Sequence, residues 1–110
     1  MELINLTDKI YQTAKAIDVE KKELEQLAKD KAQAERDYRI ALSKAIFELK
    51  ANGYAATLIT DLARGGTAEL KFARDLNEAL FVAKRSSLDA SLSQLTAFQS
   101  LLKIMKEVSD

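Results

Sequence analysis

Proline is absent from this chain, and its three glycines all lie between residues 53 and 66. The long stretches before and after that region therefore lack the two residues that interrupt helices most strongly. Both stretches are rich in alanine, leucine, lysine and glutamate, which favour the helical state. This pattern predicts two long helices, at about residues 5–50 and 67–108, separated by a connector at about residues 53–66.

Apolar residues in the first stretch recur at seven-residue intervals, the spacing of a coiled-coil seam. One column consists of Leu3, Ile10, Ile17 and Leu24 and resumes, after Lys31, at Tyr38 and Ala45. A second column, three residues further along, consists of Leu6, Leu27, Ala34 and Ala41. Around residues 18–23 Glu20 and Lys21 fill the seam, and we expect a bend or a solvated stretch there.

The last stretch carries two adjacent apolar columns, which together are wider than a single helix–helix seam requires. The first consists of Ala73, Leu76, Leu80, Ala83, Ala90, Ala97, Leu101, Ile104 and Val108. The second consists of Phe81, Leu88, Leu95, Phe98, Leu102 and Met105. We expect this helix to contact more than one neighbour, with core or oligomer contacts at Leu80, Leu88, Leu95, Phe98, Leu102 and Met105.

The connector contains its own signals for a short helix. Asn52-Gly53 predicts the end of the first long helix, because glycine readily adopts the left-handed conformation found there. A short helix of two to three turns is expected within residues 54–64, with Thr57 as its N-cap. Gly65-Gly66 is then expected to end this helix, and Thr67 to cap the next one.

These elements predict an all-α protein with a single domain, residues 1–110. Two long helices joined by a short connection most simply form an antiparallel hairpin. Such a hairpin buries only one seam and leaves an apolar column of the last helix in water, and exposed apolar surface of that extent normally marks an interface. We therefore expect a homodimer that completes a four-helix bundle.

Residue types that usually carry catalysis are missing. Histidine and cysteine are both absent, which removes the commonest general base and metal ligand as well as the thiol nucleophile. Acidic residues alternate with lysines outside the apolar columns, which indicates a solvated face rather than a metal site. The RGGTAELK segment lacks the spacing of a phosphate-binding loop. We expect no enzymatic activity, metal, cofactor or small-molecule substrate.

The connector is more apolar than a solvent-exposed turn requires. Loops that are positioned by a rigid scaffold often carry function. The candidate partner-binding residues, for another protein, are Tyr54, Leu58, Ile59, Leu62 and Arg64. The alternative is that the apolar members plug the open end of the bundle.

Nucleic-acid binding is the alternative function. Its phosphate contacts would come from Arg64, Lys71, Arg74, Lys84 and Arg85. However, the formal net charge is zero, whereas proteins that neutralise phosphates usually carry a basic excess. Acidic residues are interspersed among these five, so we rank this function after protein binding.

Nothing in the sequence predicts a membrane or secretory protein. No apolar run approaches the roughly 20 residues needed to span a bilayer. The N-terminal segment MELINLTDKIYQTAK has neither the basic region nor the apolar region of a signal peptide. We expect a cytoplasmic protein.

The segments AERDYRIALSKAI, from Ala34, and NGYAATLITDLARGGTAELKFARDLNEALF, ending at Phe81, resemble small helical proteins encoded by phages and prophages. The motifs concerned are the Ala-Glu-Arg-Asp-Tyr-Arg entry, Ala-Thr-Leu-Ile, the Asp-Leu-Ala-Arg-Gly turn and Glu-Leu-Lys-Phe-x-Arg-Asp. They cover under half of the chain. The resemblance implies no activity; it implies action by binding a host or phage protein, as in phage inhibitors of host defence nucleases.

Overall fold

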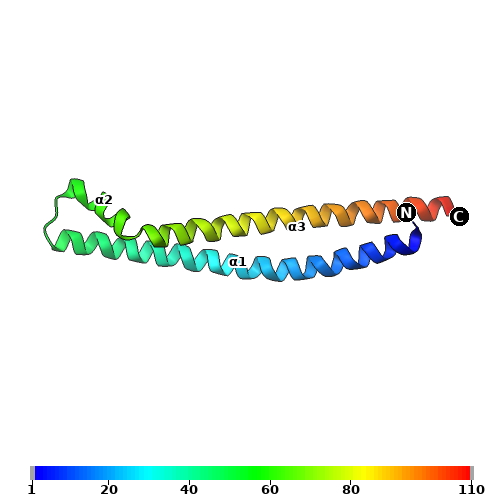
Figure 1. Ribbon diagram of the computed structural model, residues 1–110, viewed down its shortest axis with the longest axis horizontal. Helices are drawn as coiled ribbons and strands as arrows, with labels where there is room; N and C mark the ends of the chain where they lie inside the picture. Colours follow the sequence, from blue (N-terminus) through cyan, green and yellow to red (C-terminus); the bar gives the residue numbers. More distant parts are fainter. Residues whose placement is uncertain (1, 110) are drawn as a thin grey trace. The chain divides into compact units, whose positions relative to one another are not determined.

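The computed structural model describes residues 2–109, and this part of the chain forms three helices (Figure 1). They are α1, Leu3–Ala51; α2, Ala56–Gly66; and α3, Ala68–Ser109. No strand occurs within residues 2–109. The predicted all-α class is confirmed, and the two long helices occupy the two stretches that were expected to be helical.

Contacts within the chain group it into two compact units. The first, here called the terminal unit, joins the chain up to Glu25 with the chain from Val82 onward. The second, here called the connector unit, is Gln26–Phe81. The terminal unit thus pairs the start of α1 with most of α3, whereas the connector unit contains the rest of α1, all of α2 and the start of α3.

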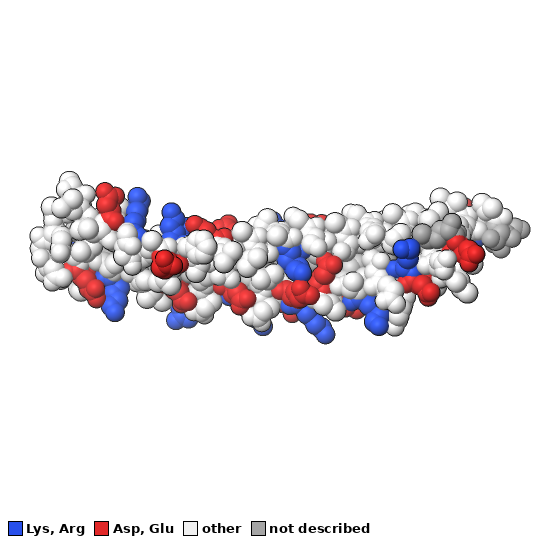
Figure 2. Space-filling model, viewed as in Figure 1, with Lys and Arg blue, Asp and Glu red and all other residues white. Residues whose placement is uncertain are grey.

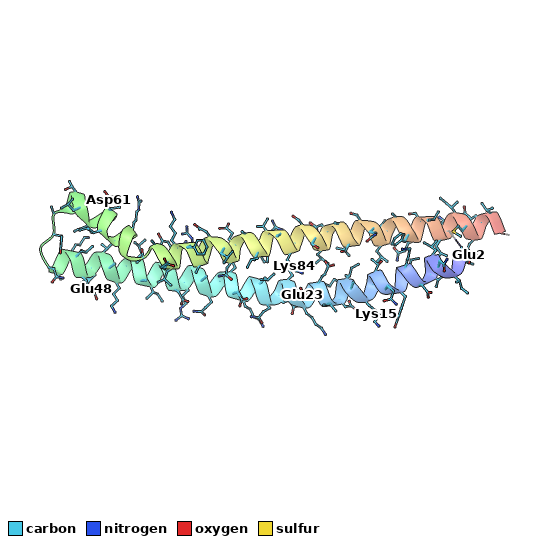
Figure 3. The ribbon with its side chains drawn as sticks, in the orientation of Figure 1. Glu2, Lys15, Glu23, Glu48, Asp61 and Lys84 are labelled. Carbon is cyan, nitrogen blue, oxygen red and sulfur yellow. The ribbon has the colours of Figure 1, made fainter. Side chains whose placement is uncertain are left out.

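The two helices of the terminal unit run antiparallel. Lys84 Nζ donates to Glu23 Oε2 at 2.7 Å, and Ser91 Oγ donates to Glu20 Oε1 at 3.0 Å (Figure 3 labels Glu23 and Lys84). A step backward along α1, from Glu23 to Glu20, is therefore a step forward along α3. This is the direction of pairing that a helical hairpin requires.

The core of the terminal unit is a single seam. Leu6 and Ile17 of α1 and Leu88 of α3 are buried. Leu88 belongs to the second column predicted on the last helix, here called the Leu88 column. Its other members in this unit are half-buried, namely Leu95, Phe98, Leu102 and Met105. Of the two columns predicted on the last helix, this one faces α1 in the terminal unit.

The connector unit is also antiparallel, and α2 adds a further contact. The Arg74 side chain of α3 lies 3.7 Å from the Glu35 carboxylate of α1, and Lys31 lies over the ring of Phe81. The buried apolar residues of this unit are Tyr38 of α1 and Ile59 and Ala63 of α2. The short helix is therefore part of the packing rather than a detached loop.

The α1 helix ends at a Schellman motif, as Asn52-Gly53 predicts. Gly53 has a φ of +82°, and its N–H donates to the Lys50 carbonyl at 3.1 Å. The N–H of Tyr54 donates to the Leu49 carbonyl at 3.1 Å. These two bonds satisfy carbonyls that the helix end would leave without partners, and glycine supplies the left-handed residue at no steric cost.

One predicted cap is wrong. Thr57 lies inside α2, whose N-cap is Ala55 without a side-chain hydrogen bond, because the Ala55 carbonyl already accepts from Leu58 and Ile59. Thr67 does lie directly before α3, and its carbonyl accepts from the Lys71 N–H at 3.0 Å. Its hydroxyl, however, donates backward to the Ala63 carbonyl at 2.8 Å instead of accepting an N–H of α3. It is buried at the one-residue junction between α2 and α3, where that carbonyl is the partner within reach.

The Gly65-Gly66 pair forms the end of α2, as expected, because the helix runs to Gly66 and is capped at Thr67. Neither glycine has a positive φ, so this helix ends without the left-handed residue that Gly53 supplies to α1. A glycine within a helix costs roughly 1 kcal/mol relative to alanine.

Candidate functional site

The connector presents a half-exposed apolar surface on one flank of α2. Ile59 and Ala63 are spaced four residues apart and point into the connector unit, where both are buried. Leu58 and Leu62 each precede them by one residue, a rotation of about 100° around the helix, and are 53% and 45% exposed. Together with Tyr54, which is 50% exposed, they form what we call the connector face.

The geometry separates the five connector residues named by the sequence into different roles. Ile59 is buried within the connector unit, as expected if the apolar connector residues plug the open end of the bundle. Tyr54, Leu58 and Leu62 remain accessible to a partner, and Arg64 is exposed. Asp61 lies on α2 between Leu58 and Arg64 in sequence and is exposed (Figure 3), so an acid and a base accompany the apolar surface.

Arg74 already has anionic and aromatic partners within the connector unit. Its Nη2 donates to Asp75 Oδ1 at 3.0 Å, and its guanidinium carbon lies 4.5 Å from the centre of the Tyr38 ring. The hydrogen bond to Asp75 raises the pKa of Arg74, with further contributions from the charges of Asp75 and Glu35. A phosphate would have to compete with these carboxylates for the guanidinium.

The other candidate phosphate contacts do not form one basic cluster. Lys84 is paired with Glu23, and this hydrogen bond raises the pKa of the lysine. Arg64 and Lys71 are exposed in the connector unit, and Arg85 is exposed in the terminal unit. Figure 2 shows acidic and basic side chains intermixed on the visible face. On this face neither sign of charge forms a patch of its own.

A shallow recess lies beside α1 and α3 in the connector unit, a feature that the sequence analysis missed. Its volume is about 560 Å³, and it is lined by Ala28, Lys31, Ala32, Glu35, Arg74, Glu78 and Phe81. Two of the lining residues on α1, Ala28 and Ala32, have small side chains that leave this space open. Lys31 Nζ lies 4.9 Å from the centre of the Phe81 ring. The lining carries two acids and two bases, a mixture suited to contact with another polypeptide.

The stretch at residues 18–23, where a bend or a solvated stretch was predicted, is exposed except for one residue. Glu20 is half-buried between α1 and α3 of the terminal unit and forms a polar layer in the seam. Its Oε1 accepts the hydrogen bond from Ser91, whereas its Oε2 is buried without a hydrogen-bond partner among residues 2–109. Lys84 is close enough for the charge of Glu20 to contribute to its raised pKa. The layer thus places the carboxylate of Glu20 within an otherwise apolar seam.

The first predicted column of the last helix is exposed to solvent along most of its length. In the connector unit Leu76 and Leu80 are 46% and 45% exposed, so Leu80, which was expected at a core or oligomer contact, does not belong to the core of this unit. In the terminal unit Ile104 and Val108 are 56% and 82% exposed, and the alanines of the column are also exposed. This column is therefore a candidate interaction surface.

No helix within residues 2–109 has an apolar stretch of the length needed to cross a bilayer. In the same part of the chain, no three acidic side chains are grouped as ligands of a metal ion would be. Comparison of the chain with protein-family models, with curated proteins and with solved structures finds no match. The candidate surfaces therefore rest on the geometry of the chain itself.

Proposed function

We propose that this chain is a non-enzymatic protein-binding protein whose connector face docks onto an apolar surface of another protein. The observation that carries this proposal is that α2 buries only some of its apolar side chains. Ile59 and Ala63 supply the packing of the helix, whereas Tyr54, Leu58 and Leu62 stay about half exposed. These three side chains contribute apolar area that the fold does not use.

The chemistry of the connector face favours a protein partner. Burying the remaining exposed half of Leu58 or Leu62 contributes about 1 kcal/mol each, from the roughly 1.5–3 kcal/mol for complete burial of such a side chain. Asp61 and Arg64 supply charges of both signs at the edge, as in the polar rim of an interface. We propose a host or phage protein as the partner, which is what the resemblance to phage proteins implies.

We also propose that the chain forms a homodimer that completes a four-helix bundle. The support for this proposal is the apolar surface that α3 leaves exposed in the terminal unit. Leu101, Ile104 and Val108 are 37%, 56% and 82% exposed there, and a second copy of the chain would cover them.

The connector face is tested by comparing two double variants as baits for binding proteins. Leu58→Ser with Leu62→Ser removes the face, and Leu76→Ser with Leu80→Ser is the matched control, because both pairs are spaced by four residues and are about equally exposed. A specific partner should be retained by the wild type and the control but lost by the first variant, with little change between low and physiological salt. Retention by both variants would contradict the proposal.

A further inference from the structure

The terminal unit exposes one face of α3 that contains no charged residue. Two columns with seven-residue spacing form it: one steps from Ala83 to Ile104 and the other from Ser87 to Val108. All members of both columns are exposed. Charged residues make up 31% of the chain and normally occupy exposed positions, so a solvent-facing strip without any of them calls for an explanation.

We infer that this uncharged α3 face pairs with the same face of a second copy in antiparallel orientation. The inference rests on the proposed dimer and adds its contact surface and its register. A two-fold axis brings a surface patch against itself, so any charge near the axis would meet its own copy. The face avoids that repulsion, and depletion of charge is also what marks the centres of protein interfaces.

The length of the face agrees with a second copy as the occupant. Its exposed side chains extend from Ala83 to Val108, so the partner must cover a long strip rather than a single pocket. Two copies of α3 in contact from Ser87 to Val108 lie together over about 33 Å at 1.5 Å per residue and bring both α1 helices alongside. The result is the four-helix arrangement.

The order of side-chain sizes along the face selects the antiparallel orientation. Ala83, Ser87 and Ala90 are small, whereas Leu101, Ile104 and Val108 are large. In a parallel pair, large residues would meet large residues at one end and leave gaps between the small ones at the other. Close packing does not tolerate such voids.

An antiparallel pair with its two-fold axis near Ala97 places large residues against smaller ones. Ile104 then faces Ala90 of the second copy, and Val108 faces Ser87. Leu101 faces Gln94, and Ala97 faces its own symmetry mate. Each pair is equidistant from Ala97 to within one residue, so the helices stay a constant distance apart along the contact.

The absence of native cysteine allows single-cysteine cross-linking without a background. Under mild oxidation, Ala97→Cys should form a disulfide-linked dimer, because a disulfide needs Cα atoms within about 7 Å and residue 97 lies at the axis. Thr96→Cys is the matched control, since it is equally exposed but rotated about 100° around the helix, and it should remain monomeric. A mixture of Ala90→Cys and Ile104→Cys should yield the mixed dimer.

Light scattering of the wild type separates failure of the dimer from failure of its register. A monomer at tens of micromolar concentration overturns both the proposed dimer and this inference. A dimer in which Ser87→Cys cross-links to itself establishes a parallel pair and overturns the antiparallel register alone. A dimer in which none of the positions 87, 90, 97 and 104 cross-links overturns the choice of face. Ile104→Glu should weaken dimerisation at least tenfold while circular dichroism shows the helices retained.

Discussion

The three glycines of the connector should respond in opposite directions to the same substitution by alanine. Gly53 has a φ of +82°, a conformation that costs an L-residue about 1–2 kcal/mol. Alanine also lowers the conformational entropy of the unfolded chain, which offsets roughly 0.4–1 kcal/mol of this cost. We expect Gly53→Ala to lower the free energy of unfolding by about 1 kcal/mol.

Gly65 and Gly66 are helical, and a Cβ added at either meets nothing within 4 Å. Alanine is favoured over glycine inside a helix by about 0.8–1.0 kcal/mol. Because the pair lies at the end of α2, where fewer backbone hydrogen bonds depend on it, we expect about 0.5–1 kcal/mol of stabilisation from each alanine. The double variant should therefore be stabilised by about 1–2 kcal/mol.

Thermal unfolding followed by circular dichroism resolves these differences. The entropy of unfolding of 110 residues is about 230 cal/mol/K, so 1 kcal/mol shifts Tm by about 4 °C. Gly53→Ala should lower Tm by about 4 °C and the Gly65→Ala, Gly66→Ala double variant should raise it by about 4–8 °C, at equal protein concentration. Ala79→Gly, at an exposed position of α3, calibrates the helical difference. Destabilisation of the double variant comparable to that of Gly53→Ala would show that the end of α2 needs the conformational freedom of glycine.

Three further predictions concern buried and paired side chains. Glu20→Leu should raise the free energy of unfolding by about 1 kcal/mol, because it removes a buried oxygen without a partner; a loss of stability in urea would mean that the carboxylate stabilises the seam. Ile59→Ala should cost about 2–3 kcal/mol and Leu58→Ala only about 0.5 kcal/mol in the same assay, and equal costs would contradict their different burial. Lys84 has a raised pKa in the folded state, so its pairing with Glu23 should stabilise fully below pH 10.5 and lose that contribution as the pH rises through the raised value. The stability difference between the wild type and Lys84→Met should accordingly shrink in alkaline solution, and a constant difference would exclude the pairing.

The parts of the fold that the sequence predicts are those set by long-range regularity. The absence of proline and the seven-residue columns give the helices and the inward positions of Ile17, Tyr38 and Leu88, because one period repeated over many turns leaves few alternatives. Gly53 is predicted for a different reason: the end of α1 needs a left-handed residue, and Asn52-Gly53 is the place where the sequence supplies one.

Local signals fail at the junction of α2 and α3 because the same residues serve two purposes. Thr67 is a good N-cap, yet its hydroxyl bonds backward to Ala63 when only one residue separates the helices. Two adjacent columns on the last helix are both apolar, so which of them faces α1 depends on packing: the bulkier Leu88 column fills the seam. The connector face follows the same rule, since Ile59 is distinguished from Leu58 only by its burial within the connector unit.

The division of the chain into two units has a consequence for the order in which it folds. Residues 26–81 are contiguous in sequence, so their pairing closes a short loop, whereas pairing of residues up to Glu25 with those from Val82 onward closes a much longer one. Loop-closure entropy grows with loop length, and local contacts form faster. We expect the pairing of α1 with α3 to start near the connector and to propagate toward the chain ends. Pulse-labelling hydrogen exchange should show amides of residues 30–50 protected before those of residues 5–20; the reverse order would exclude this route.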